Sequence, residues 1–113
     1  MGPGEMKTMM FRRLYWVTEQ VQRGGTSQVT GVYTSIPDLI HRGLRWIGDH
    51  KGCEFRLTLV KLDCEREPLG SWQSPDFSDL GPSLDQFIET DEFSADQCAA
   101  LQHELQRFST VHA

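Results

Sequence analysis

Two segments near the N-terminus combine aromatic and β-branched residues, which favour extended structure. Residues 11–21 (FRRLYWVTEQV) predict a first strand, and residues 28–33 (QVTGVY) predict a second. The pair Gly24-Gly25 between them is typical of a turn. The two strands are therefore expected to form a hairpin.

Hydrophobic residues return at helical spacing after this hairpin, at Ile36, Leu39, Ile40, Leu44 and Ile47. Ser35 precedes the run as an N-cap, with Asp38 three positions further on in a pattern that resembles a capping box. Pro37 falls in the first turn, where its missing N–H does no harm. The pattern predicts a helix that Gly48 or Gly52 ends.

Residues 53–64 (CEFRLTLVKLDC) have the strongest strand pattern in the chain. Side chains alternate between the two sides of a strand, which places Cys53, Phe55, Leu57 and Leu59 on one face and Val60, Leu62 and Cys64 on the other. Residues 69–73 (LGSWQ) predict a short edge strand, which Ser74-Pro75 stops.

The rest of the chain predicts two helices. Residues 79–90 carry an apolar stripe, and Ser83 with Gln86 offers a start alternative to Gly81-Pro82. The last helix begins after Ser94, where Gln97 completes a capping box. Its apolar face consists of Cys98, Leu101, Leu105 and Phe108, and Phe93 is placed to meet Cys98 as a hydrophobic staple.

This order of elements predicts an α+β fold with a small antiparallel sheet of about four strands and helices packed on it. If the first strand fills the gap between the second and third, the sheet order is 2-1-3-4. We expect a disordered leader over residues 1–10, a single domain over residues 11–108 and a C-terminal tail over residues 109–113.

Charge and composition exclude several classes of partner. Residues 1–56 hold eight Lys/Arg and five Asp/Glu, a balance of +3, whereas residues 57–113 hold three and eleven, a balance of −8. Because nucleic-acid binding needs a cationic surface, no nucleic-acid partner is expected. No apolar run approaches the roughly 18 residues that span a bilayer, so no membrane partner is expected. Three cysteines without a signal peptide predict free thiols and a cytoplasmic location.

Candidate catalytic and metal-binding residues lack the partners that such chemistry needs. His50 and Cys53 form one loose pair, whereas zinc usually takes two close pairs of ligands, and Cys64 and His103 lie far away. Cys98 falls on an apolar stripe among acidic neighbours, which disfavours a reactive thiolate. The carboxylates of Asp63, Glu65, Glu67, Asp91 and Glu92 lie in predicted turns, where they are expected to be solvated. The sequence therefore predicts no catalytic site, no metal and no cofactor.

The predicted strands are apolar on parts of both faces. Leu14 and Trp16 share one face of the first strand, and Tyr15 and Val17 share the other. A sheet with helices on one side should have a polar outer face. Either helices cover both faces here, or a partner covers the second face. We expect Tyr15 and Val17 to face the first helix, which leaves Trp16 on the second face.

These patterns predict a non-enzymatic interaction or regulatory domain that self-associates, as a homodimer or other homo-oligomer, or binds another protein. The predicted partner-contact residues are Leu14, Trp16, Trp46 and Trp72. The alternative is a small-molecule-binding module or minor enzyme with an aromatic-lined pocket between sheet and helices, near Tyr33 and Trp72. The acidic C-terminal half is either a docking surface for a basic partner or a solubilising exterior.

Overall fold

The four strands pair into one antiparallel sheet, as the computed structural model shows for the described residues 14–22, 24–49, 54–61 and 68–109. The strands are β1 (Leu14–Val21), β2 (Ser27–Tyr33), β3 (Glu54–Lys61) and β4 (Gly70–Gln73). They lie side by side in the order β2-β1-β3-β4, which confirms the predicted α+β class and the predicted sheet order. The predicted strand ends at residues 11–13, 53 and 62–64 lie outside the described residues.

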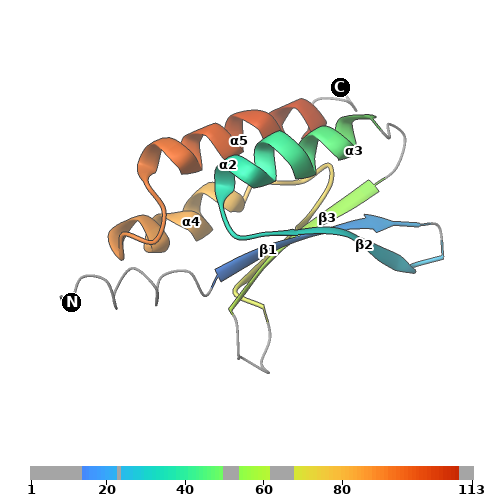
Figure 1. Cartoon of the computed structure of the whole chain (residues 1–113), viewed down its shortest axis with the longest axis horizontal. Helices are drawn as coiled ribbons and strands as arrows, with labels where there is room; N and C mark the ends of the chain where they lie inside the picture. The colour runs from blue at the N-terminus through green and yellow to red at the C-terminus, as the bar shows by residue number, and fades with distance from the viewer. Residues whose placement is uncertain (1–13, 23, 50–53, 62–67, 110–113) are drawn as a thin grey trace.

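The described helices all lie on one side of this sheet (Figure 1). The first helical run is continuous and consists of α2 (Ile36–Asp38), the π-helical segment η2 (Leu39–Leu44) and α3 (Arg45–Asp49). It is followed, after β3 and β4, by α4 (Leu80–Glu89) and α5 (Ala95–Ser109). In the described part of the chain, no helix is both long and apolar enough to cross a bilayer.

Of the alternative boundaries predicted for two helices, one at each helix is wrong. Gly48 lies inside α3 and does not end the first helix, while Gly52 lies outside the described residues. Helix α4 begins at Leu80, so the alternative start at Ser83 is not used. Gly81 and Pro82 are accommodated in the first turn, where backbone N–H groups have no partner within the helix.

Both predicted serine caps are present. The backbone N–H of Asp38 donates to the Ser35 hydroxyl at 3.2 Å, which satisfies one donor at the start of α2. At the start of α5, the N–H of Gln97 donates to the Ser94 hydroxyl at 3.1 Å, and the Gln97 side-chain oxygen accepts from the Ser94 N–H at 3.4 Å. This reciprocal pair is the predicted capping box.

The core fills the space between the sheet and the helices. Trp16 of β1 has no exposed surface, and its ring lies 6.3 Å from that of Trp72 and 5.7 Å from that of Phe93, centroid to centroid. The strands also contribute Leu14, Phe55, Leu57 and Leu59, and the helices contribute Ile36, Leu39, Leu44, Ile47, Leu80, Leu84, Cys98, Leu101 and Leu105. This one cluster joins every helix to the sheet.

The predicted orientation of β1 is wrong. Trp16, and not Tyr15 or Val17, faces the helices, because Trp16 belongs to the same buried cluster as Ile36 and Leu39. Tyr15 and Val17 are half-buried and point to the opposite side, since side chains alternate along a strand. The two C-terminal helices cover the same face as the first helical run, so none of the described helices lies on the second face of the sheet (Figure 1).

Candidate interaction surface

The sheet face opposite the helices, here called the outer face, carries both apolar and ionic side chains. Its apolar end pairs Tyr15 with Val60 across β1 and β3. Its ionic end pairs Glu19 with Arg56 across the same two strands. The guanidinium of Arg56 lies 3.8 Å from the Glu19 carboxylate, and both side chains are partly shielded. A face with both apolar and ionic side chains can contact a partner and still be compatible with water when no partner is bound.

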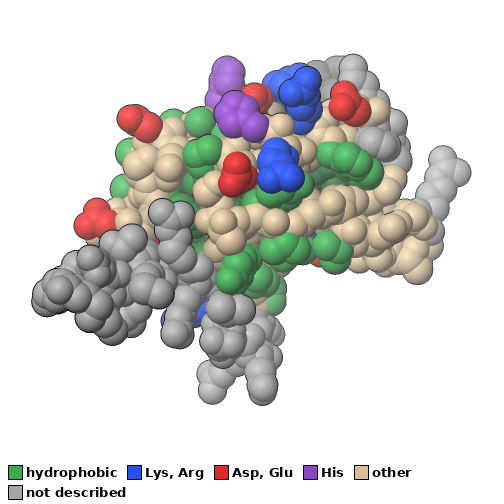
Figure 2. Space-filling view, in the orientation of Figure 1, with side chains coloured by type: hydrophobic (Ala, Val, Ile, Leu, Met, Phe, Trp, Pro, Cys, Tyr) green, Lys and Arg blue, Asp and Glu red, His purple; other side chains and the backbone are tan. Residues whose placement is uncertain are grey.

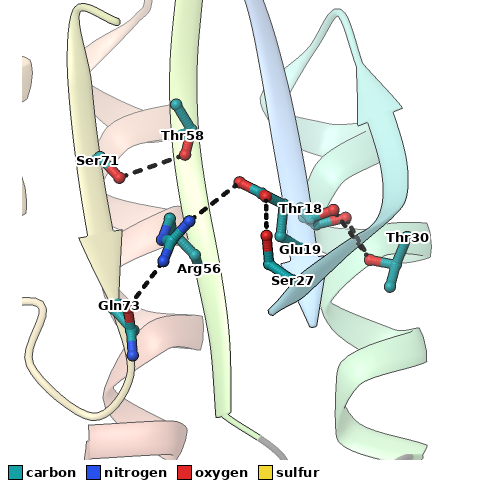
Figure 3. A network of polar contacts seen from close by, with 8 residues as sticks. All are labelled: Thr18, Glu19, Ser27, Thr30, Arg56, Thr58, Ser71 and Gln73. Atoms are coloured by element: carbon teal, nitrogen blue, oxygen red, sulfur yellow. Dashed lines mark hydrogen bonds and ion pairs between the residues drawn. The ribbon is translucent and has the colours of Figure 1, made fainter. Parts of the chain in front are cut away.

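A polar network holds the ionic end of the outer face across all four strands (Figure 3). The Ser27 hydroxyl of β2 donates to Glu19 of β1 at 2.8 Å. Arg56 of β3 joins Glu19 and also donates to the Gln73 side-chain oxygen of β4 at 3.4 Å. Each charge of the central pair therefore has a partner within the sheet, and the Gln73 side-chain amide also donates to a second carboxylate at this end, that of Glu54, at 3.1 Å.

The strand β2 forms one edge of the sheet and presents two large apolar side chains to solvent. Val29 is 56 % exposed and Val32 is 57 % exposed. Residues 24–37 contain no Asp, Glu, Lys, Arg or His, and this stretch includes the whole of β2. The surface along β2 in Figure 2 is accordingly made of hydrophobic and uncharged polar side chains.

A bulge in β2 is hydrogen-bonded to the neighbouring strand through one threonine of β2 and one of β1. Thr18 lies opposite Gly31, whereas the next residue, Glu19, lies opposite Val29, so Thr30 is the extra residue. The hydroxyls of Thr18 and Thr30 lie 2.8 Å apart, and the Thr30 hydroxyl also donates to the Thr18 carbonyl at 3.2 Å (Figure 3). The irregularity leaves these two hydroxyls hydrogen-bonded and increases the local twist of the strand.

The opposite edge of the sheet, β4, has features that oppose strand addition. It has four residues, with Pro68 two residues before it and Pro75 two residues after it. Asp76 pairs with Gln73 beyond the strand end. Hydrogen bonds from the Ser78 hydroxyl and from the Ser78 N–H lower the pKa of Asp76, so this carboxylate stays ionised. Short strands, prolines and charges all discourage edge-to-edge pairing.

The four predicted contact residues are not gathered on one surface. Leu14, Trp16 and Trp72 are at most 7 % exposed and belong to the core. Trp46 of α3 is half-buried and packs against that core from the helical side. The sequence predicted β2 as a strand but not as a contact surface, because its two exposed valines are separated by Thr30 and Gly31. The absence of charge over residues 24–37 is the signal that could have revealed it.

The structure also places several of the candidate catalytic and metal-binding residues. Burial raises the pKa of the Cys98 thiol, and the nearby Asp85 carboxylate raises it further. The described residues contain no cluster of three or more His, Cys, Asp or Glu that could hold a metal ion. His50, Cys53 and Cys64 lie outside the described residues.

The aromatic residues expected in a pocket between sheet and helices are packed instead. The ring of Tyr33 lies against Gly31 and Gly43, and Trp72 lies in the core. Neither residue lines the hollow beside the start of α4 or the hollow between α3 and the end of α5.

Comparison of the chain with protein-family models, with curated proteins and with solved structures found no match.

Proposed function

We propose that this chain is a non-enzymatic interaction domain that self-associates through the β2 edge of its sheet. The observation that supports this proposal most directly is the contrast between the two edges. Strand β4 is short and flanked by prolines, whereas β2 has seven residues, no charge and two valines that are more than half exposed. The bulge at Thr30 is a feature that discourages pairing, but a long, uncharged edge strand with exposed apolar side chains is still a template for pairing with another strand.

A second copy of the chain is the occupant that the charge pattern favours. The net charge of −5 opposes close approach of two copies over most of their surface. The stretch of residues 24–37 around β2 adds no charge of its own to this repulsion. Two copies that meet there by a two-fold rotation bring β2 antiparallel to the partner's β2, which is the pairing used throughout this sheet.

The pairing would extend the sheet without disturbing the core. Backbone groups along the free side of β2 would gain hydrogen-bond partners, as in other cases of strand addition. The contact area of one seven-residue strand is small, below the roughly 1,200 Å² of a typical stable interface. Association is therefore expected at micromolar to high-micromolar concentration rather than below it.

Sedimentation velocity over a concentration series tests the proposal, with two single substitutions that add the same charge at opposite edges. Val32→Lys places a cation on β2, and Ser71→Lys places one on the exposed edge of β4. In a symmetric dimer of the Val32→Lys variant, the two introduced ammonium groups lie at the same interface and repel each other. The wild-type chain and Ser71→Lys should associate, and Val32→Lys should remain monomeric.

Two outcomes would contradict the proposal. A wild-type chain that remains monomeric at high-micromolar concentration rules out self-association. Equal association of the two variants shows that copies meet at another surface. Far-UV circular dichroism establishes whether both variants are folded, which makes either result interpretable.

A further inference from the structure

We infer that the groove between α3 and the end of α5 binds a small organic carboxylate with an apolar body, a site separate from the proposed β2 contact. The groove has a volume of about 790 Å³ and is lined by η2, α3 and the last turns of α5. Its size falls in the range of small-molecule sites, which are mainly apolar with a few oriented polar groups.

The floor of the groove is apolar. Leu44 and Ile47 are at most 5 % exposed and lie deepest, while Ile40 and Phe108 are half-buried beside them. These side chains come from the helical run on one side and from α5 on the other. An aliphatic or aromatic body seated there would remove more of this apolar surface from water.

The rim of the groove carries charged side chains, of which Arg45 is the available cation. The guanidinium of Arg107 is already engaged by the Glu104 carboxylate at 3.2 Å. Arg45 is exposed and forms no hydrogen bond or ion pair within the described part of the chain. A planar guanidinium can bind a carboxylate through two parallel hydrogen bonds.

The other polar groups of the rim set the orientation of the ligand. His41 is one residue from Ile40 on η2 and adds a second donor near the cation. Asp49, at the end of α3, carries the opposite charge and repels a carboxylate. The acid group is therefore expected at Arg45, with the apolar body directed over Leu44 and Phe108. Figure 2 shows Lys/Arg, His and Asp/Glu side chains together with hydrophobic ones over the helical layer.

The backbone of η2 is a second feature of this groove. A π-helical turn is rare, and such turns occur frequently at functional sites because they widen the helix and displace side chains. Here η2 contributes Ile40, His41 and Leu44 to the groove. The widened turn thus presents both floor and rim residues from one segment.

Titration of the isotope-labelled chain with hexanoate, hexanol and hexylamine, followed by amide chemical shifts, tests the inference. Hexanoate should shift amides of residues 40–49 and 104–108, whereas hexanol, which has the same chain without the charge, should bind much more weakly. Hexylamine, which carries the opposite charge, should bind no better than hexanol. Arg45→Gln should weaken hexanoate binding about tenfold or more, as expected for loss of a charge-assisted hydrogen bond.

Arg42→Gln is the matched control. Arg42, on η2, is likewise exposed and without a partner among the described residues, but it does not line the groove. Its substitution should leave hexanoate binding unchanged. Equal binding of hexanol, equal loss in the two arginine variants, or shifts confined to other elements would each overturn the inference. Repeating the titration on Val32→Lys separates this site from the β2 contact, since Val32 does not line the groove.

Discussion

The ring of Tyr33 on β2 lies directly against Gly43 of η2. A β-carbon built at Gly43 would stand 2.7 Å from Cε2 of Tyr33, closer than real β-carbons approach other atoms. The same ring covers Gly31, where a β-carbon would also meet Tyr33 atoms. Two glycines on different elements therefore leave room for one tyrosine, and this contact joins the edge strand to the helical layer.

Gly43→Ala is expected to destabilise the fold by about 1–3 kcal/mol, because the added methyl group overpacks against Tyr33. Gly48→Ala is the matched control on α3. A β-carbon at Gly48 meets nothing within 4 Å, so alanine should stabilise the helix by about 0.5–1 kcal/mol. Urea denaturation of both variants measures the two changes. If both substitutions change the free energy of unfolding in the same direction, Tyr33 moves away from Gly43 at little cost.

Trp16→Glu is expected to abolish folding. The side chain has no exposed surface, and a carboxylate there would be buried among Trp72, Phe93 and leucines without a partner. Trp16→Phe should remain folded, because the indole N–H forms no hydrogen bond that would be lost. The loss in free energy of unfolding for Trp16→Phe should be smaller than the value of about 3–5 kcal/mol that is typical of Trp→Ala. A folded Trp16→Glu variant by circular dichroism would be inconsistent with the core as described.

Asp91→Gly is expected to stabilise the chain by about 0.5–1 kcal/mol. Asp91 follows α4 with a φ of 62°, a left-handed conformation that favours glycine. The N–H of Asp91 donates to the Ile88 carbonyl and that of Glu92 to the Phe87 carbonyl, which is a Schellman motif. Glu89→Gly, inside the same helix, should destabilise by about 1 kcal/mol. Thermal unfolding compares the two; a loss of stability in Asp91→Gly would mean that the carboxylate has a role of its own.

The buried Cys98 thiol should resist alkylation until the chain unfolds. Burial and Asp85 raise its pKa, so the folded chain keeps this proton when an unfolded chain loses it. The stability linked to Cys98 is therefore complete below the usual thiol pKa of about 8.5 and decreases as the pH rises above it. Iodoacetamide labelling followed by peptide mass analysis distinguishes Cys98 from the other cysteines. Rapid labelling of Cys98 at neutral pH would contradict its burial.

Local features of the sequence were sufficient to predict most elements and their order. The capping box at Ser94 and Gln97 and the turn at Gly24-Gly25 depend on residues close together in the chain. The two glycines have φ values of 94° and 91°, which glycine adopts without strain. The sheet order followed from connection rules that depend on the order of elements and not on particular side chains.

The sequence alone determined that this chain has strands apolar on both faces, helices with a single apolar stripe and a charge-free segment at residues 24–37. Only the tertiary structure decided which face of β1 meets the helices. The face with Leu14 and Trp16 is about as hydrophobic as the face with Tyr15 and Val17, and alternation along a strand does not say which of the two faces is buried. Which face is buried depends on which side chains best fill the space between the sheet and all the described helices. This fit is decided by close packing in three dimensions. The same packing placed Tyr33 over Gly43 and left β2 as an open edge.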